Sequence, residues 1–478
     1  MLWKALTVLD FVLTALAVMT VLRRPREPRA MIAWLLALLL LPVLGLVLFV
    51  LIGEPRLKRT RRRRQRRRRK LAPKLSRRTE ALREVRVPHE TVPIPDELSN
   101  LVRAATRLSR HPPTYGNEVI IYFEAEKTFL ARQLAIEAAE SHIHLEYYIF
   151  QPDETGRALL DLLTRKVRQG VRCRVLLDFI GCWRWPRSFA RSFHDGGVEL
   201  AFFLPMVPWR GRWRVNFRNH RKLTVIDGKV GFTGSQNIGD EYLGRRKKHG
   251  PWRDTHMRIV GPAVQQLQEI FVEDWHYTTG MDLVADEYFP PPQRVGSRVV
   301  QVIPSGPDDP ANVMHQLLFA AIAAARRSVC IATPYFVPDT SMVLAFQAVA
   351  YRGVRVQLLI PSRSDHRVAL WAARSYYEEL SAAGVEIYEY DLGMLHSKVV
   401  VVDGSWALVG SANMDERSFT LNFEVTTLLY DAELADELHA DFEALVARSQ
   451  RIEPTGRTDW TFRETLSLGF ARMASPLL

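Results

Sequence analysis

The sequence predicts an α/β protein with two similar layered domains that are related by a pseudo-two-fold axis. The first observation is a repeat: the apolar run Ile143 to Phe150 returns as Val329 to Phe336, each after an Ala-rich helical stretch. In both copies a second helical stretch and another apolar strand follow, Val171 to Asp178 in one and Val354 to Pro361 in the other. Strands that alternate with helices predict helices layered on a sheet, and two copies predict two such domains.

The length and the distribution of charge narrow the class of protein. A chain of 478 residues exceeds the usual limit for one hydrophobic core, and its 47% apolar content is enough for two. The formal net charge is +13, but twelve Lys and Arg residues without any acid lie between Arg56 and Lys70, so the rest of the chain is nearly neutral. A nucleic-acid enzyme is expected to spread its positive charge over the binding face, so no nucleic-acid partner is predicted.

The N-terminal segment predicts two transmembrane helices. The stretch from Ala30 to Ile52 has 23 uncharged residues, interrupted by Pro42 and Gly45, and is long enough to cross about 30 Å of hydrocarbon. The stretch from Ala5 to Leu22 is nearly as apolar, although Asp10 weakens the case for a full span. We therefore expect a multi-pass membrane protein.

The basic run after the second helix satisfies the positive-inside rule, so the catalytic portion is expected to face the cytoplasm. Two interpretations of this run stay open: a topology signal alone, or a contact with anionic lipid head groups. The expected organisation is a membrane anchor over residues 1–53, a basic linker over 54–113, a first domain over 114–290, and a second domain with a C-terminal tail over 291–478.

Each copy contains the same cluster of polar residues at the same spacing. The first reads His220-Arg-Lys222, Asp227-Gly228 and Gly234-Ser235-Gln-Asn237, and the second reads His396-Ser-Lys398, Asp403-Gly404 and Gly410-Ser411-Ala-Asn413. Side chains two apart on a strand share one face, and Asp-Gly between apolar runs predicts a hairpin. The return strand then delivers the Ser and Asn beside the His and Lys.

Such a cluster suits a tetrahedral phosphate, and two of them place a histidine on either side of one phosphorus. One neutral imidazole attacks in line while the other, protonated, donates to the leaving oxygen. Lys222, Lys398, Ser235, Asn237, Ser411 and Asn413 are the expected phosphate contacts. Lysines and amides stabilise the phosphate charge, so neither a metal nor another cofactor is expected.

The carboxylates near the clusters are candidates for two roles. Asp227 and Asp403 belong to the catalytic motif, but an Asp before Gly in a tight turn is explained by the turn, and we favour that structural interpretation. Each catalytic histidine also needs an acid to orient it. Glu424 and Asp254 each precede an apolar, strand-like run, although equating them requires an insertion around residues 245–250.

These motifs resemble the phospholipase D superfamily, whose mark is HxKxxxxD followed by GSxN. The resemblance to bacterial cardiolipin synthases within it is closer and covers nearly the whole chain. It rests on the two apolar N-terminal helices and on further phrases, among them Arg218-Asn-His-Arg-Lys222, Gly239-Asp-Glu-Tyr-Leu-Gly244, Thr333-Pro-Tyr-Phe336 and Asn413-Met-Asp-Glu-Arg-Ser-Phe419.

The resemblance implies two phospholipase D-like domains in the inner membrane of a bacterium and a reaction that joins two phosphatidylglycerols, releasing glycerol. It also implies a phosphohistidine nucleophile at His220, an acid at His396 and an orienting carboxylate at Glu424. A nuclease of the same superfamily and a membrane scaffold without activity are the alternatives. The near-neutral body disfavours the first and the two complete clusters disfavour the second. Transfer versus hydrolysis and the oligomeric state stay open.

Overall fold

The computed structural model describes residues 2–23, 28–49, 57–78, 94–205, 216–245, 250–309, 311–453, 461–473 and 475. It separates into two units, Met1–Thr60 with Pro205–Asn216, and Arg61–Leu204 with Phe217–Leu478.

In the N-terminal unit the described residues form α1 (Leu2–Leu22), α2 (Pro28–Leu40), α3 (Pro42–Leu48) and the start of the helix that follows. The expected single helix from Ala30 to Ile52 is interrupted, because Pro42 has no N–H group and disfavours a helical conformation at the residue before it. Leu41 accordingly has φ −129° and ψ 66°. Within the described parts of the chain, no helix is both long enough and apolar enough to span a membrane.

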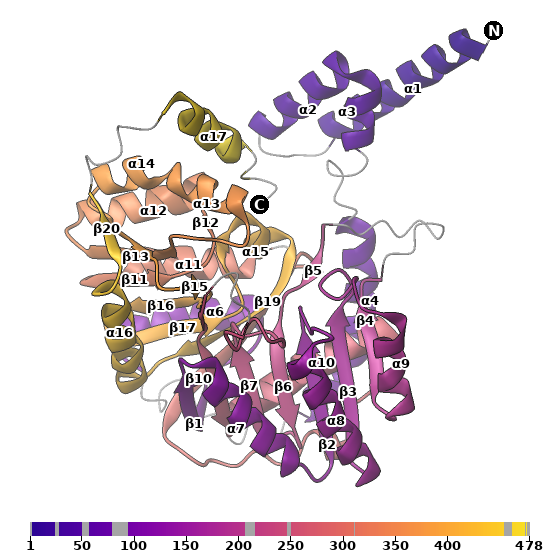
Figure 1. Ribbon diagram of the computed structural model, residues 1–478, viewed down its shortest axis with the longest axis vertical. Helices are drawn as coiled ribbons and strands as arrows, with labels where there is room; N and C mark the ends of the chain where they lie inside the picture. Colours follow the sequence, from indigo (N-terminus) through magenta and orange to yellow (C-terminus); the bar gives the residue numbers. More distant parts are fainter. Residues whose placement is uncertain are drawn as a thin grey trace. The chain divides into compact units, whose positions relative to one another are not determined.

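One continuous sheet of sixteen strands forms the larger unit (Figure 1). Its first half consists of β1 (Thr114–Tyr122), β2 (His142–Tyr147), β3 (Arg172–Asp178), β4 (Glu199–Phe203), β6 (Lys222–Ile226), β7 (Val230–Gly234) and β9 (His256–Val260). Its second half consists of β10 (Arg298–Ser305), β11 (Ser328–Ala332), β13 (Arg355–Pro361), β14 (Glu386–Tyr390), β16 (Val399–Val402), β17 (Trp406–Gly410), β19 (Asn422–Leu429) and β20 (Gln450–Ile452), with β5 (Arg218–Asn219) joined to β19.

The strand order is β20-β14-β13-β11-β16-β17-β19-β10-β1-β9-β7-β6-β2-β3-β4. Read outward from the β1–β10 pair, each half repeats the other apart from the additional strand β20, which confirms the predicted repeat. At this junction the two strands run antiparallel, with Thr114 opposite Val300. The two domains therefore share one sheet and one hydrogen-bonded seam.

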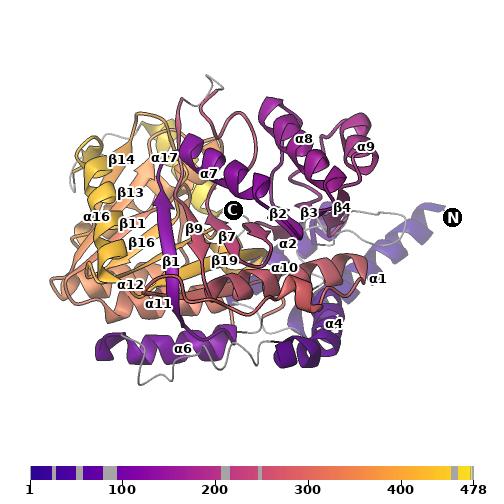
Figure 2. The ribbon, with the colours of Figure 1, turned by 90° about the horizontal axis from the view of Figure 1, so that it is seen from below.

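Helices cover both faces of the sheet. In the first half they are α7 (Ala125–Glu137), α8 (Glu154–Arg168), α9 (Arg187–Asp195) and α10 (Ala263–Thr279). Figure 2 shows α10 along one face of these strands and the other three along the opposite face. The second half has α11 (Val313–Ala324), α12 (Thr340–Tyr351), α13 (Arg367–Arg374), α14 (Tyr377–Ala382), α15 (Glu416–Thr420), α16 (Ala432–Val446) and α17 (Phe462–Met473). Two separate apolar cores result, one in each half.

The segment expected to be a basic linker is largely part of the larger unit. Helix α6 (Ser99–Ser109) buries Leu101, Val102 and Ala105 in the core of the second half. Helix α4 (Leu57–Arg78) carries most of the basic run. The amphipathic spacing of α6 explains its docking, because residues three and four apart share one helix face.

Arg64 of α4 is buried in this unit. Neither interpretation of the basic run, as a topology signal or as a lipid contact, included a buried arginine. Its guanidinium lies 2.5 Å from Asp274 and 2.9 Å from Asp308, and it stacks 4.5 Å from the ring centre of Phe423. Arg68 pairs with Glu273 at 3.0 Å. The two carboxylates beside Arg64 attract a buried guanidinium, so this part of the run is a protein contact.

We expect Arg64→Gln to destabilise the larger unit by about 3 kcal/mol, because a buried carboxylate loses a charged partner. The melting temperature of the detergent-solubilised protein should fall by several degrees. Arg66→Gln, an exposed position on the same helix, is the matched control and should change it little. Equal melting temperatures for the two variants would contradict a structural role for Arg64.

Candidate active site

Two short parallel strand pairs each join a segment of the first half of the chain to a strand of the second half. Strand β5 pairs with the start of β19, Arg218 opposite Asn422, and His220 then donates its N–H to the carbonyl of Phe423 at 2.9 Å. In the other copy, β8 (Trp252–Arg253) pairs with β15 (Met394–Leu395), and His396 donates its N–H to the carbonyl of Arg253 at 2.7 Å. The backbone therefore sets each histidine beside the carboxylate of the opposite copy.

The histidine–carboxylate pairs are crossed between the copies. Nδ1 of His220 lies 3.0 Å from Oε2 of Glu424, and Nδ1 of His396 lies 2.6 Å from Oδ1 of Asp254. All four side chains are buried. Asp254 and Glu424 thus occupy equivalent places, as the sequence predicted, although most of the inserted segment before Asp254 lies outside the described residues. The crossing was not anticipated.

The serines of the GSxN motifs support these carboxylates. The hydroxyl of Ser235 donates to Oδ1 of Asp254 at 2.7 Å, and the hydroxyl of Ser411 donates to Oε2 of Glu424 at 2.5 Å. Both serines are fully buried and neither lines the catalytic cavity. Their expected role as phosphate contacts is therefore corrected: in this structure they hold the two acids in place.

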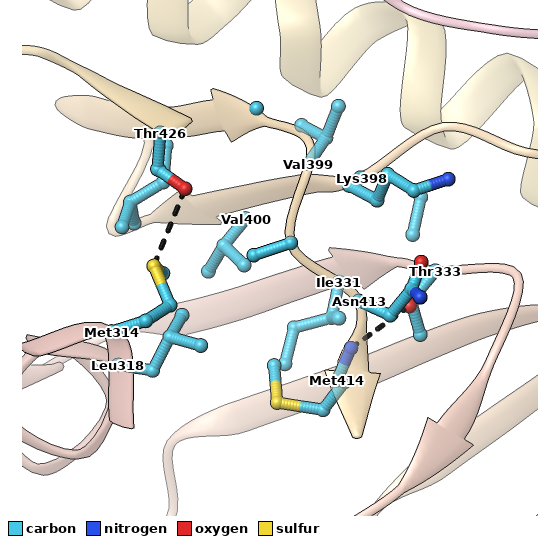
Figure 3. Close-up of a pocket in the computed structure, with 14 residues that line it drawn as sticks. Met314, Leu318, Ile331, Thr333, Lys398, Val399, Val400, Asn413, Met414 and Thr426 are labelled. Carbon is cyan, nitrogen blue, oxygen red and sulfur yellow. Dashed lines mark hydrogen bonds between the residues drawn. The ribbon is translucent and has the colours of Figure 1, made fainter. Parts of the chain in front are cut away.

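The two lysines make the same hydrogen bond in both copies. Each ammonium donates to the carbonyl of its own histidine at 2.6 Å, Lys222 to His220 and Lys398 to His396. Figure 3 shows the apolar surroundings of the second copy, where Met314, Leu318 and Ile331 line a small cavity together with Lys398 and Asn413. Both lysine side chains are buried, which holds their ammonium groups away from bulk water.

The motif aspartates lie away from this site. The carboxylate of Asp227 accepts the N–H groups of residues 140, 141 and 142 at 2.8–2.9 Å, and Asp403 accepts those of residues 326, 327 and 328. Both aspartates have positive φ, 53° and 55°, as a tight Asp-Gly turn requires. The two aspartates connect the hairpins to the neighbouring strands. This agrees with the structural interpretation and not with a catalytic role beside the histidines.

His220 and His396 line one cavity of about 520 Å³, together with Asn237 and Asn413. The prediction that the two clusters converge on one site is therefore confirmed. The sequence analysis predicted no role for several residues that line the cavity: Tyr148, Arg218, Tyr242, Trp252, Tyr335, Asp365 and Arg417. The Tyr148 ring centre lies 4.9 Å from that of His220, and the Trp252 ring centre lies 5.2 Å from that of His396. The sequence did contain a signal for some of these cavity residues, because aromatic residues lie near the end of each repeated strand run.

Burial sets the protonation of the site. Desolvation lowers the pKa of His220 to about 4 and also lowers that of His396, against the opposing effects of Glu424 and Asp254. Burial alone would raise the pKa of Asp254, but His396 and Lys398 outweigh it and lower the pKa to about 2. Burial lowers the pKa of Lys398 to about 8. At neutral pH the site therefore holds neutral imidazoles, and Asp254 and Glu424 are ionised.

This arrangement is able to carry out nucleophilic and acid–base chemistry on one anionic group. A neutral imidazole is a competent nucleophile, and an arriving phosphate raises the proton affinity of the other imidazole. Among the described residues, the group of side chains spaced to hold a metal ion is Cys330, His439 and Glu443. None of the three lines the catalytic cavity.

We expect Glu424→Gln and Asp254→Asn each to lower kcat by roughly two orders of magnitude, and the variant that lacks the partner of the acid histidine to shift the alkaline limb of its pH profile downward. A carboxylate stabilises the imidazolium form, so its loss lowers the pKa of the paired histidine further. As pH rises, the acid histidine of the variant therefore loses its proton at a lower pH than that of the wild type. Steady-state rates from pH 5 to 9 measure the shift.

Glu389→Gln is the control for this experiment, because Glu389 is also buried but pairs with Arg374 outside the cavity. It should leave the position of the alkaline limb in place even if the protein is less stable. An unmoved limb in both Glu424→Gln and Asp254→Asn would show that neither carboxylate sets the protonation of its histidine.

Comparison with known proteins places this site in a family. A family model described as "Cardiolipin synthase, PLD-like domain" matches residues 134–275 and 318–446, and one described as "Phospholipase_D-nuclease N-terminal" matches residues 12–54. The crystal structure of a phosphatidylserine synthase from Haemophilus influenzae superposes with a TM-score of 0.61 over 79% of this chain and 99% of that chain. Its sequence identity is 14%, so it shows the shared fold.

Curated relatives extend the match over most of the chain. A cardiolipin synthase of Geobacillus kaustophilus is 44% identical over 392 residues, which are 81% of this chain and 78% of the relative. Cardiolipin synthase A of Pseudomonas putida is 40% identical over 383 residues, 79% of this chain and 78% of the relative. The chain belongs to the cardiolipin synthase family of phospholipase D-like proteins.

Proposed function

We propose that the chain synthesises cardiolipin by transferring a phosphatidyl group from one phosphatidylglycerol to a second, with release of glycerol. The observation that carries the proposal is the pair of buried histidines in one cavity, each held by a carboxylate. The names of the relatives, cardiolipin synthase in each case, support the choice of substrate.

The reaction consists of two displacements at one phosphorus. In the first, a neutral imidazole forms a P–N bond while the P–O bond to glycerol breaks, and the other imidazole gives its proton to the departing oxygen. In the second, that imidazole takes the proton of a hydroxyl of the second phosphatidylglycerol. The hydroxyl oxygen forms the new P–O bond as the P–N bond breaks.

Asn237 and Asn413, which line the cavity, are proposed to contact the non-bridging oxygens of the phosphate during both steps. Lys222 and Lys398 do not line the cavity, and they are proposed to stabilise these oxygens by their charge. The ammonium groups are buried, so their attraction for a phosphate is screened little by water. By resemblance the nucleophile is His220 and the acid is His396. The symmetric contacts of the two histidines support either order.

We further propose that the N-terminal helices attach the enzyme to the bacterial inner membrane, with the larger unit on the cytoplasmic side. The substrates are lipids, so the enzyme must work at a membrane surface. Many apolar side chains of α1 and α2 are exposed within their own unit, among them Phe11, Leu16, Leu39 and Leu40. The basic residues that follow α3 in the sequence support the cytoplasmic orientation.

Purified protein supplied with radiolabelled phosphatidylglycerol in detergent should form cardiolipin and free glycerol in equal amounts. Thin-layer separation of the lipids and an enzymatic glycerol assay measure the two products. The reaction should continue in excess chelator, because lysines and amides carry the charge stabilisation. Phosphatidic acid as the sole lipid product would identify a hydrolase and overturn the proposal.

The histidine variants separate the two steps in the same assay. His220→Ala and His396→Asn should each stop turnover, and intact-protein mass measurement should find a phosphatidyl adduct in one of them. The adduct forms only where the nucleophile is kept, since attack can precede a slow, unassisted departure. His194→Ala, an exposed histidine on α9, is the control and should keep full activity.

A further inference from the structure

We propose that helix α17 places its exposed apolar face in the surface of a membrane that contains anionic phospholipid. The surface that makes this contact, the apolar stripe, consists of Phe462, Leu466, Phe470 and Met473. The inference concerns where the enzyme meets its substrates, and it rests on the proposed function only in so far as those substrates are lipids. It is independent of the N-terminal helices.

The apolar stripe lies along one side of α17. Its members follow one another at intervals of four, four and three residues. At about 100° per residue, they fall within about 80° of the helix circumference. Phe462 and Met473 are each 78% exposed, and Phe470 is 68% exposed. Apolar side chains aligned on one exposed face are typical of an interaction surface, whereas single scattered ones are not.

The opposite side of α17 attaches the helix to the second half of the protein. Ala471 lies about 180° around the helix from Phe462 and is buried in a small apolar cluster. The guanidinium of Arg472 donates to Glu379 at 2.7 Å and lies 4.5 Å from the ring centre of Tyr376. These contacts determine which side of α17 faces outward, so the apolar stripe is directed away from the protein.

Helix α17 lies one layer of side chains from the catalytic cavity. Val337 shares the apolar cluster of Ala471 and also lines the cavity. Helix α17 packs against α13, as Figure 1 shows, and Arg367 and Val368 of α13 line the cavity too. Val368 is itself 50% exposed. A membrane that receives the apolar stripe therefore lies close to the cavity in which the lipids react.

The size of the apolar stripe fits a membrane better than a second protein. A stable protein interface uses about 20–30 residues on each side. The apolar stripe offers four side chains on a helix of 12 residues, which is too few for such an interface. A single apolar helix face is sufficient for a position in the interfacial layer of a membrane, where it enters the boundary between head groups and acyl chains.

The charge near the apolar stripe fits a membrane with anionic head groups. Arg463 follows the first residue of the stripe, and Arg367 is on the neighbouring helix at the cavity. Both arginines are exposed, and neither has an ion-pair partner within the part of the chain that the structure describes. Exposed basic side chains beside an apolar helix face attract anionic lipids such as phosphatidylglycerol.

The test measures the depth of single side chains while the full-length protein is in vesicles of phosphatidylglycerol and phosphatidylcholine. The three native cysteines are buried, so a polarity-sensitive thiol fluorophore should label an introduced Phe470→Cys selectively in the folded protein. Its emission should shift to the blue in vesicles. Lipids that carry a nitroxide on the acyl chain should then quench it, because the side chain reaches the acyl-chain boundary.

Thr465→Cys is the matched control, because Thr465 is exposed on the same helix but lies about 100° from the middle of the apolar stripe. Its label should lose less fluorescence to the nitroxide lipids. Equal quenching at the two positions, or no quenching at Phe470→Cys, would overturn the inference. So would a blue shift at Phe470→Cys that grows with protein concentration without quenching by lipid, since a second copy would then cover the stripe.

These measurements need no turnover. Failure of the proposed function would appear separately, as the absence of cardiolipin from the same vesicles.

Discussion

The crossed histidine–carboxylate pairs are the constraint on which the site depends. His220 takes its carboxylate from Glu424 of the second copy, and His396 takes its carboxylate from Asp254 of the first. Neither copy alone contains a histidine with its orienting acid. The shared sheet and the strand pairs β5–β19 and β8–β15 hold the copies in the register that these contacts need. The duplication is therefore functional as well as architectural.

The free-energy cost of burying these charges explains why each carboxylate has a hydroxyl partner in addition to its histidine. A charge moved from water into a protein interior is strongly destabilised unless it is paired and hydrogen-bonded. Glu424 is paired with His220 and accepts the hydroxyl of Ser411, and Asp254 has the same two kinds of partner. The serine of each GSxN motif thus stabilises the carboxylate by donating a hydrogen bond to it. The result is a pair of imidazoles kept neutral and oriented before substrate arrives.

Charge outside the motifs breaks the symmetry of the molecule. Arg64 of α4 reaches Asp274, and Asp274 also pairs with Arg221, which follows His220 in the chain. Arg218 and Arg417 line the catalytic cavity, and the corresponding positions in the other copy are Met394 and Glu241. The catalytic groups are therefore symmetric, whereas the residues that flank them are not.

The sequence by itself determined the repeat, the hairpins and the catalytic pairs, because these depend on spacing along a strand and on turn chemistry. His220 and Lys222 share a face in any strand, and Asp227-Gly228 forms a tight turn wherever it lies. Tertiary structure decided which acid meets which histidine, where the serine hydroxyls point and that Arg64 is buried. It also interrupted the expected apolar helix at Pro42. Those contacts join residues as many as 359 positions apart, such as Arg64 and Phe423, and only the packed chain brings such residues together.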